Sequence, residues 1–303
     1  TTAGLAVQDG DRWVGLPETA QHQVMALASE PSGRLWAAII PNSRQDPAGF
    51  WVCEPGSRRV RRVNPPGLPP GHGILSLYLR HPSELWVAAT SAGLWRLDPR
   101  RPSLPAEHIV IPGWSKDFGV QVVTGDGRGG LWVAGGPWVG HFDGQRWLTL
   151  GPEPGGLGKD DAVMSMVGAP DGSAWVIFFN RKGLDQIRRE GGRLVLGQRL
   201  TQGHPLAQHA AYSLGADRDG SLWVGSARGL LHWDGRRVER FGRNAGLPGE
   251  DCSQNALWQD ANGDIYVGLS VGLARGQVGS GRRPQLPPSA ILVISSTVRC
   301  GDG

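Results

Sequence analysis

Ionisable side chains recur along this chain at similar points of successive segments, each just before a predicted strand. Histidine and carboxylate groups bind polar ligands through hydrogen bonds and transfer protons near neutral pH. Residues this far apart in sequence act together only if the fold brings them to one place. The recurring residues are His22, His72, Asp117, Asp160 with Asp161, His209, and Glu250 with Asp251.

Three short motifs look like chemical sites but lack the surroundings that such sites need. Residues 268–272 match GxSxG, yet no helix pattern and no histidine follow them. Residues 125–130 match GxGxxG, but the next residues predict a strand rather than the helix that faces a pyrophosphate. Residues 217–220 begin like a calcium loop without its later carboxylate ligand. We interpret all three as turns.

The elements that position these residues are revealed by a repeated segment. A short motif, typified by 219–225 (Asp-Gly-Ser-Leu-Trp-Val-Gly), recurs six times with an aromatic anchor at its centre. The anchors stand at positions 36, 86, 132, 175, 223 and 266, so the steps between them are 50, 46, 43, 48 and 43 residues. A period in this range indicates one supersecondary unit copied many times.

One repeat predicts four short antiparallel strands. Within residues 209–242, strands are expected at 209–216, 221–225, 230–233 and 236–241, separated by turns rich in Asp and Gly. The second strand is apolar on both faces and must be covered on both sides. Radial stacking of such sheets gives an all-β propeller of four-stranded blades, in which the anchors pack between neighbouring blades.

The number of third strands predicts the number of blades. Seven third strands are expected to begin at or near positions 4, 49, 93, 138, 183, 229 and 272, but only six anchor hairpins precede them. The sequence therefore starts inside a blade, and residues 286–296 form one more strand that completes this blade or begins another domain. We predict seven blades closed by strands from both termini, with six blades as the alternative.

The predicted organisation is a propeller over residues 1–285 and a C-terminal strand within 286–303. That last segment is either the closing strand or the start of a truncated following domain. The expected blade repeats lie near 4–17, 22–65, 72–112, 118–151, 161–200, 209–242 and 252–279.

The repeat resembles that of the two-component regulator propeller family. The pattern D-x-x-G-x-L-W-V-G-(S/T)-x-x-G-L stands here as residues 217–230, and a Gly-Leu-Pro linker appears at 15–17, 67–69 and 246–248. The resemblance covers about residues 1–279 and is strongest in the repeat around Trp223. Residues 287–293 resemble the first strand of the three-tyrosine immunoglobulin-like domain that commonly follows these propellers.

The resemblance implies a non-catalytic sensor module on the periplasmic or extracytoplasmic side of a bacterial inner membrane. In the family, such propellers are tethered through a membrane helix to a histidine kinase, a hybrid regulator or a diguanylate cyclase. The expected partners are therefore a small-molecule or oligosaccharide ligand, the missing downstream domains, and a second copy in a homodimer. No cofactor is implied.

Composition excludes several alternatives. The charge of 31 basic against 27 acidic residues gives +4, and the basic residues are scattered, so no nucleic-acid groove is expected. Cys53, Cys252 and Cys300 form no CxxC pair, and an odd count gives no disulfide framework. The eight histidines show no metal-binding spacing, and no metal is expected. No apolar run approaches the roughly 18 residues of a membrane helix, and no signal peptide is recognised.

In a propeller the first strand of each blade lines the channel, and the turns between second and third strands share one face with the linkers that precede first strands. We expect the ligand on this face, with residues 39–48 as a flap. The candidate binding residues are His22, Arg44, His72, Trp114, Asp117, Trp138, Asp160, Asp161, Arg181, His209, Arg228 and Asp251.

Two tryptophans among charged groups suit a polar ligand with flat apolar faces, such as an oligosaccharide. Three hypotheses remain at this point: a ligand sensor, a propeller enzyme such as a lyase or glycoside-active protein, and a protein-interaction platform. Glycoside hydrolysis needs two carboxylates about 5–10 Å apart. Asp160 with Asp161 and Glu250 with Asp251 are the candidate pairs, although adjacent strand residues point to opposite faces.

Overall fold

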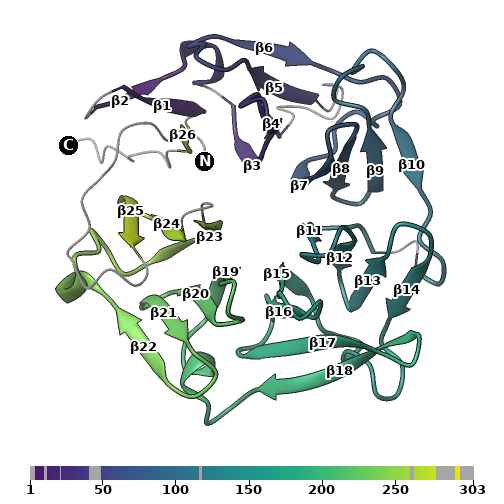
Figure 1. Cartoon of the computed structure of the whole chain (residues 1–303), viewed down its shortest axis with the longest axis vertical. Coiled ribbons are helices and arrows are strands. Elements are labelled where there is room, and N and C mark those ends of the chain that lie inside the picture. Colours follow the sequence, from purple (N-terminus) through teal and green to yellow (C-terminus); the bar gives the residue numbers. More distant parts are fainter. Residues whose placement is uncertain are drawn as a thin grey trace, which may run out of the picture.

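The chain forms a ring of antiparallel β-sheets around a central axis (Figure 1). The computed structural model describes residues 4–9, 12–20, 22–40, 49–115, 118–259, 263–277 and 291–293. Six sheets are each built from consecutive strands and are called blades 1 to 6. A further sheet, called the closing sheet, has the order β2-β1-β26 and lies between blade 6 and blade 1 (Figure 1).

The first three blades each have four strands. Blade 1 contains β3 (Val24–Ser29), β4 (Leu35–Ile39), β5 (Gly49–Cys53) and β6 (Val60–Val63). Blade 2 contains β7 (Ile74–His81), β8 (Glu84–Ala89), β9 (Gly93–Leu97) and β10 (Glu107–Ile109). Blade 3 contains β11 (Val122–Gly125), β12 (Leu131–Gly135), β13 (Trp138–Phe142) and β14 (Trp147–Leu150).

The remaining sheets differ in their number of strands. Blade 4 contains β15 (Val163–Gly168), β16 (Ala174–Phe178), β17 (Leu184–Glu190) and β18 (Arg193–Leu200). Blade 5 contains β19 (Ala211–Ala216), β20 (Leu222–Ser226), β21 (Gly229–Trp233) and β22 (Val238–Phe241). Blade 6 contains β23 (Cys252–Gln259), β24 (Asp264–Leu269) and β25 (Gly272–Gln277). The closing sheet contains β1 (Leu5–Asp9), β2 (Arg12–Gly15) and β26 (Ile291–Val293).

The β-propeller fold predicted from the repeat is confirmed. Counted by sheets of consecutive strands, the ring has six blades, which is the alternative count given above. The strands at the two ends of the chain pair with each other: β1 and β26 are antiparallel, with Ala6 opposite Leu292. The closing sheet occupies the remaining position in the ring (Figure 1).

The three motifs that resemble chemical sites are turns. Residues 125–130 join β11 to β12, and residues 268–272 span the junction of β24 and β25. In the turn after β19, the Gly220 N–H donates to the Asp217 carbonyl at 3.0 Å, and Gly220 has a φ of 89°. Glycine adopts this left-handed conformation without the steric cost of a side chain, so the turn chemistry fixes the hairpin.

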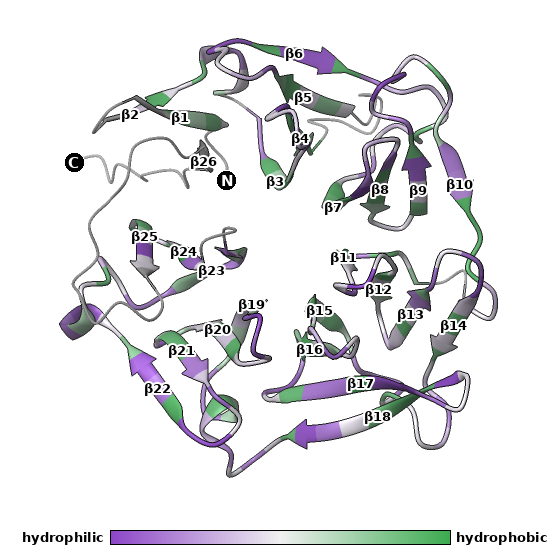
Figure 2. Cartoon of the chain, viewed as in Figure 1, coloured by the Kyte–Doolittle hydropathy of each residue, from purple (hydrophilic) through white to green (hydrophobic). Residues whose placement is uncertain are grey.

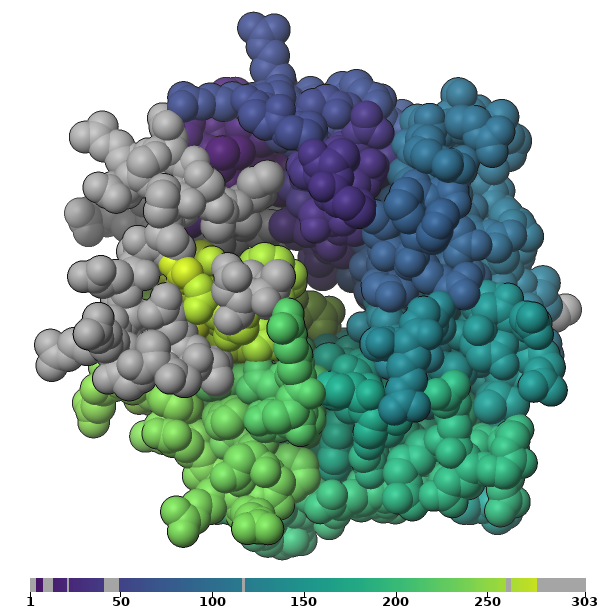
Figure 3. All heavy atoms as spheres, viewed as in Figure 1, coloured from purple at the N-terminus to yellow at the C-terminus, as the bar shows by residue number. Residues whose placement is uncertain are grey.

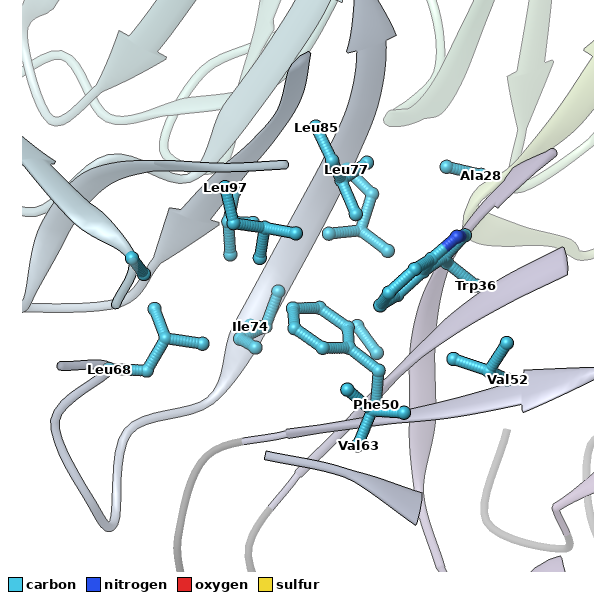
Figure 4. Close-up of a cluster of buried hydrophobic side chains, with 13 residues drawn as sticks. Ala28, Trp36, Phe50, Val52, Val63, Leu68, Ile74, Leu77, Leu85 and Leu97 are labelled. Atoms are coloured by element: carbon cyan, nitrogen blue, oxygen red, sulfur yellow. The ribbon is translucent and has the colours of Figure 1, made fainter. Parts of the chain in front are cut away.

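The anchor residues form the core between blades. Trp36, Trp86 and Trp132 are at most 1% exposed, and Trp175 and Trp223 are buried almost as fully. Tyr266, the sixth anchor, is only half-buried. Figure 4 shows Trp36 and Phe50 of blade 1 facing Ile74, Leu77 and Leu85 of blade 2. Burial of one such indole is worth about 4–6 kcal/mol as an upper bound, so stacking between blades stabilises the ring.

Polarity and backbone shape vary systematically from the axis outward. The outermost strands β10 and β22 are hydrophilic and exposed (Figure 2), as solvent-facing edges require. The innermost strands β3, β7, β15, β19 and β23 each contain a register shift near their first residues. Such bulges increase the local twist and redirect side chains. They occur where the linker from the preceding blade enters the channel wall.

Candidate ligand-binding rim

The linkers that precede first strands lie beside the turns between second and third strands, and together we call them the linker rim. Backbone hydrogen bonds join the two in blade after blade. Thr90 N–H donates to Gly73 carbonyl at 2.9 Å, and Phe179 N–H donates to Ala162 carbonyl at 2.9 Å. Ser270 N–H donates to Asp251 carbonyl at 3.0 Å. The rim is thus one continuous surface around the channel mouth, and Figure 3 shows the ring hollowed at its centre.

Two predicted binding residues, Arg44 and Asp117, lie outside the described residues, as does most of the proposed flap at 39–48. The other ten lie on the rim, but they differ in what their side chains contact. Asp160, Arg228 and Asp251 are exposed, whereas the remaining seven are half-buried: His22, His72, Trp114, Trp138, Asp161, Arg181 and His209.

The histidines of the rim occupy three different environments. His72 lies with Nδ1 3.1 Å from the Thr90 carbonyl oxygen and 3.3 Å from Ser91 Oγ. Ser91 has a φ of 51°, an uncommon conformation for a residue with a side chain. His22 packs with its ring centre 5.6 Å from that of Trp51. His209 has no side-chain hydrogen bond or ion pair within the described residues and is available to a ligand.

Asp161 and Arg181 belong to a buried ion network rather than to the free surface. Arg181 Nε donates to Asp161 Oδ1 at 2.8 Å, and a terminal nitrogen donates to Asp185 Oδ2 at 2.6 Å. Asp185 is completely buried and also accepts from Arg199 at 3.2 Å. Burial lowers the pKa of Arg181, but the hydrogen bonds to Asp161 and Asp185 outweigh it and the pKa is raised.

The same network distinguishes the two members of the first carboxylate pair, Asp160 and Asp161. Asp161 Oδ2 accepts from the Gly158 N–H at 2.9 Å, so both of its oxygens are engaged. Asp160 is exposed, and its carbonyl accepts from the Asn180 amide. The two carboxylates therefore have different surroundings and different partners. Asp161 is held in place by Arg181, which is a poor starting point for a proton-transferring group.

The two predicted ligand-stacking tryptophans are neighbours. The ring centres of Trp114 and Trp138 are 6.1 Å apart at an interplanar angle of 33°. Trp114 also packs against the core cluster between blades 2 and 3, and its indole N–H donates to the Phe118 carbonyl at 3.0 Å. A large part of both rings is already covered by protein, so a ligand reaches only their outer edges.

Sequence reasoning missed three exposed apolar side chains on the rim. Phe118 is 37% exposed and lies against Gly136, in the linker that precedes β11. Phe179 and Val271 follow second strands and are 53% and 62% exposed. Phe179 and Val271 come just after predicted second strands, and that placement was the signal available for them in the sequence. The aromatic surface of the rim is supplied by Phe118 and Phe179 more than by the tryptophans.

Sequence reasoning also missed a large bulge in the innermost strand of blade 6. Cys252 pairs with Leu269 and Leu257 pairs with Val267, so residues 253–256 oppose a single residue of β24. Gln254 and Asn255 are exposed there, and Asn255 has a φ of 53°. A non-glycine residue at positive φ is uncommon, and such residues concentrate at functional positions.

The seam between blades 4 and 5 is open on the rim. A cavity of about 470 Å³ is lined by Lys182, Ala207 and Gln208 among others. Lys182 Nζ donates to the Gln208 carbonyl at 3.0 Å across this seam. Nearby His204 caps the short helix η2 (Pro205–Ala207), and its burial lowers its pKa. The cavity adds polar backbone and a cation to the surface between Arg181 and Arg228.

Neither a metal-holding cluster nor a membrane-spanning helix occurs in the part of the chain that the structure describes. No group of three or more His, Cys, Asp or Glu side chains is arranged there to hold a metal ion. The helices within those ranges are too short and polar to span a membrane. The three described short helices are single 3-10 turns of three residues each: η1 (Pro17–Thr19), η2, and η3 (Arg243–Ala245).

No family model matches the sequence, and no curated protein matches it. Several solved structures are similar in fold. A streptogramin B lyase shares 13% identity at a TM-score of 0.66, with 90% of this chain and 86% of that chain covered. YCF48 bound to a D1 peptide shares 12% identity at a TM-score of 0.62, covering 91% and 85%.

A third similar structure is an extracellular domain assigned to a hybrid two-component system of B. thetaiotaomicron. It shares 13% identity at a TM-score of 0.52, and the match covers 90% of this chain but 39% of that chain. At these identities the three likenesses establish the β-propeller fold. They also show that this one fold serves proteins with different reported activities.

Proposed function

We propose that this chain is an extracytoplasmic ligand-sensing propeller of a bacterial signal-transduction receptor. Its linker rim binds a polar ligand with flat apolar faces, of which an oligosaccharide is the best example. The observation that carries the proposal is the rim itself. It is one surface that combines exposed aromatic rings with charged groups that have no partner in the described protein.

The side chains that support this proposal come from blades on both sides of the channel. Phe118 and Phe179 offer aromatic faces on which a sugar ring stacks. Arg228 and Asp251 are exposed, and their side chains form no hydrogen bond or ion pair within the described ranges. Charged groups of this kind bind hydroxyls, while the bulge at Gln254 and Asn255 offers amides from the channel wall. Stacking surface and polar partners are what a carbohydrate site requires.

The sensing role is supported by the family resemblance of the repeat and by the likeness to an extracellular domain of a two-component system. In such a receptor the domains beyond the propeller would carry the signal across the membrane. The rim would then act through its shape in the bound and free states, without breaking a covalent bond in the ligand.

A propeller lyase is the second candidate, because the fold is also similar to that of a streptogramin B lyase. The rim carries histidines that a proton-transfer mechanism requires, with His209 the least engaged by protein groups. The engagement of Asp161 by Arg181 and Gly158 weighs against glycoside hydrolysis through the first carboxylate pair.

The test is calorimetric titration with a panel of oligosaccharides, run beside a turnover assay on the same compounds. We expect saturable binding without turnover. Phe179→Ala should weaken binding by about tenfold, the upper range of an aromatic contact. Leu104→Ala, which changes an exposed apolar residue in the turn before the fourth strand of blade 2, should leave affinity unchanged.

If the chain turns over any compound in the panel and His209→Ala abolishes that turnover, the chain is an enzyme and the sensor proposal is wrong. If no sugar in the panel binds, or if the Phe179 and Leu104 variants bind equally well, the rim is not a carbohydrate site.

A further inference from the structure

The seam between blades 4 and 5 is also open at the opposite face of the ring, where the first hairpin turn and the turn before the fourth strand of each blade lie. A cavity of about 350 Å³ there is floored by Trp175 and Trp233, whose ring centres are 5.5 Å apart. Asp171, Asp219 and Asp234 line it together with one cation, Arg218. The proposed function does not use this cavity, which we call the seam groove.

The equivalent seam between blades 2 and 3 is filled by an arginine. Arg80 of blade 2 donates through Nε to the Gly129 carbonyl of blade 3 at 2.7 Å. Its guanidinium carbon lies 5.5 Å from the centre of the Phe142 ring. The same group reaches Gly144, in the turn before β14. Arg80 is therefore held by two turns and one aromatic ring of the next blade.

Strand register shows that the seam groove is equivalent to the seam between blades 2 and 3, but lacks the arginine. Arg80 follows Leu79, which pairs with Leu85 one residue before the anchor Trp86. In blade 4, Gly168 pairs with Ala174 one residue before the anchor Trp175. Ala169 therefore stands where Arg80 stands, and Ala169 lines the seam groove.

The blade 5 side of the seam groove also corresponds to the blade 3 side of the seam that Arg80 fills. Phe142 pairs with Leu131 in blade 3, and Trp233 pairs with Leu222 in blade 5. The two turns that hold Arg80 correspond to the turns at Gly220 and Gly235, and both glycines line the groove. The surface that receives a guanidinium in one seam is thus present in the other, with nothing from blade 4 to occupy it.

Two further seams are bridged by side chains at this face. Between blades 3 and 4, Arg128 donates to the Pro170 carbonyl at 3.3 Å. Between blades 5 and 6, the Gln259 amide donates to Asp217. In the seam groove, Ala169 is too short to make a bridge of this kind.

An indole N–H without an acceptor among the described residues also lines this place. Trp36 donates its indole N–H to Glu30 at 2.7 Å, and Trp223 donates to Asp217 at 2.8 Å. Glu30 and Asp217 occupy the register position of Ala169. Trp175 is 4% exposed, and its N–H has no acceptor within the described chain. An occupant of the groove can therefore supply an acceptor as well as a cation.

We propose that the seam groove binds an arginine side chain of a peptide or partner protein. The guanidinium would lie over Trp233 as that of Arg80 lies over Phe142, among the carboxylates of Asp219 and Asp234. The carbonyl of the same residue would accept from the Trp175 N–H. Arginine fits better than lysine, because a planar guanidinium stacks on an aromatic ring and donates in several directions at once.

The test is a titration of the ¹⁵N-labelled chain with N-acetyl-arginine amide, followed by NMR at the indole N–H signals. We expect saturable shifts of the Trp175 signal, weaker shifts with the lysine analogue, and none with the uncharged citrulline analogue. Ala169→Arg should abolish the shifts, because its own side chain fills the groove. Thermal unfolding of this variant checks that the fold is retained.

Matched variants separate this groove from non-specific cation binding. Asp219→Asn should weaken arginine binding about threefold, the value of one partly exposed ion pair. Asp143→Asn alters the blade 3 turn that corresponds to the turn at Asp234, in a seam that Arg80 already fills, and should change nothing. Arg80→Ala should open a second site and raise the stoichiometry to two. Equal shifts with arginine and citrulline, or unchanged binding in Ala169→Arg, would overturn the proposal.

Discussion

At the scale of single residues, most blades place a carboxylate at the turn beside the anchor. Asp217 accepts from the indole N–H of Trp223 at 2.8 Å and from Ser221 Oγ at 3.0 Å. His232, directly opposite the anchor on the third strand, stacks on it with ring centres 4.3 Å apart. Trp223 is therefore held by a hydrogen bond as well as by apolar packing. Among blades 3 to 5, only blade 4 has no carboxylate at the position of Asp217, where Ala169 stands.

This difference predicts unequal costs for the same substitution in two blades. Trp223→Phe removes a buried hydrogen bond to a carboxylate and should cost about 1.5–3 kcal/mol beyond the loss of packing. Trp175→Phe removes an N–H that has no acceptor in the described chain and should cost only the packing term. Guanidinium unfolding of both variants measures the gap, and equal costs would show that the Asp217 bond is energetically neutral.

Blade 3 carries a buried histidine–carboxylate pair at the same position. His141 Nε2 donates to Asp126 Oδ2 at 2.9 Å, and the two side chains are 1% and 3% exposed. Burial lowers the pKa of His141 more than the carboxylate raises it. Burial raises the pKa of Asp126, but the bonds from His141 and from two backbone N–H groups outweigh it, and this pKa is lowered.

The lowered pKa of His141 sets the sign of a pH dependence. An unfolded histidine binds a proton below about pH 6.5, whereas folded His141 stays neutral to lower pH. The unfolded state then binds more protons, so stability should fall on acidification with a slope of at most about 1.4 kcal/mol per pH unit. His141→Gln should flatten the unfolding free energy between about pH 6.5 and 5, and His81→Gln, at an exposed position, should not.

At the scale of elements, the starts of first strands and the ends of second strands position the site, and the second strands carry the core. The bulge near the start of β23 is the largest of those in the first strands, because four residues oppose one. Asn255 adopts a φ of 53° there, a conformation that costs asparagine little and a β-branched residue much more. This bulge is a property of backbone shape, which side-chain type alone does not specify.

The bulge predicts opposite effects of two substitutions at one position. Asn255→Gly should keep or raise stability by up to about 1 kcal/mol, because glycine adopts positive φ freely. Asn255→Val should lower it by about 1–2 kcal/mol. Thermal unfolding separates the two, and a valine variant as stable as the glycine variant would mean that the bulge rearranges. If Asn255 contacts ligand, both variants weaken binding while only one weakens the fold.

The elements were largely predictable from the sequence, and the site much less so. Glycine lead-ins and Trp anchors gave the start of every third strand to within a residue, since both follow from local turn chemistry and period. The engagement of Asp161 by Arg181 and Asp185 was not predictable, because it joins a linker, a turn and a third strand. Likewise, the covering of Trp114 by the core and the exposure of Phe179 depend on packing between blades, which carries no local signal.

At the scale of the whole molecule, the ring distributes stability among nearest-neighbour contacts, as repeat proteins do. Each interface buries one anchor, so the loss of one contact weakens two blades. The closing sheet is the weakest link by this reasoning: β1 pairs with β26 over three residues, whereas β4 and β5 of blade 1 pair over five. Its apolar residues Leu5 and Leu16 pack against Val24 of blade 1.

A truncation predicts how the ring depends on that link. Removing residues 286–303 deletes β26 and leaves the inner edge of β1 without its antiparallel partner, so the closing sheet should loosen first. We expect faster proteolysis within residues 4–20 and a lower unfolding temperature, with blades 2 to 5 still protected from hydrogen exchange. Removing only 294–303 retains β26 and serves as the matched control. If both truncations behave alike, then the pairing of Ala6 with Leu292 contributes nothing to closure, and blades 1 to 6 hold the ring by themselves.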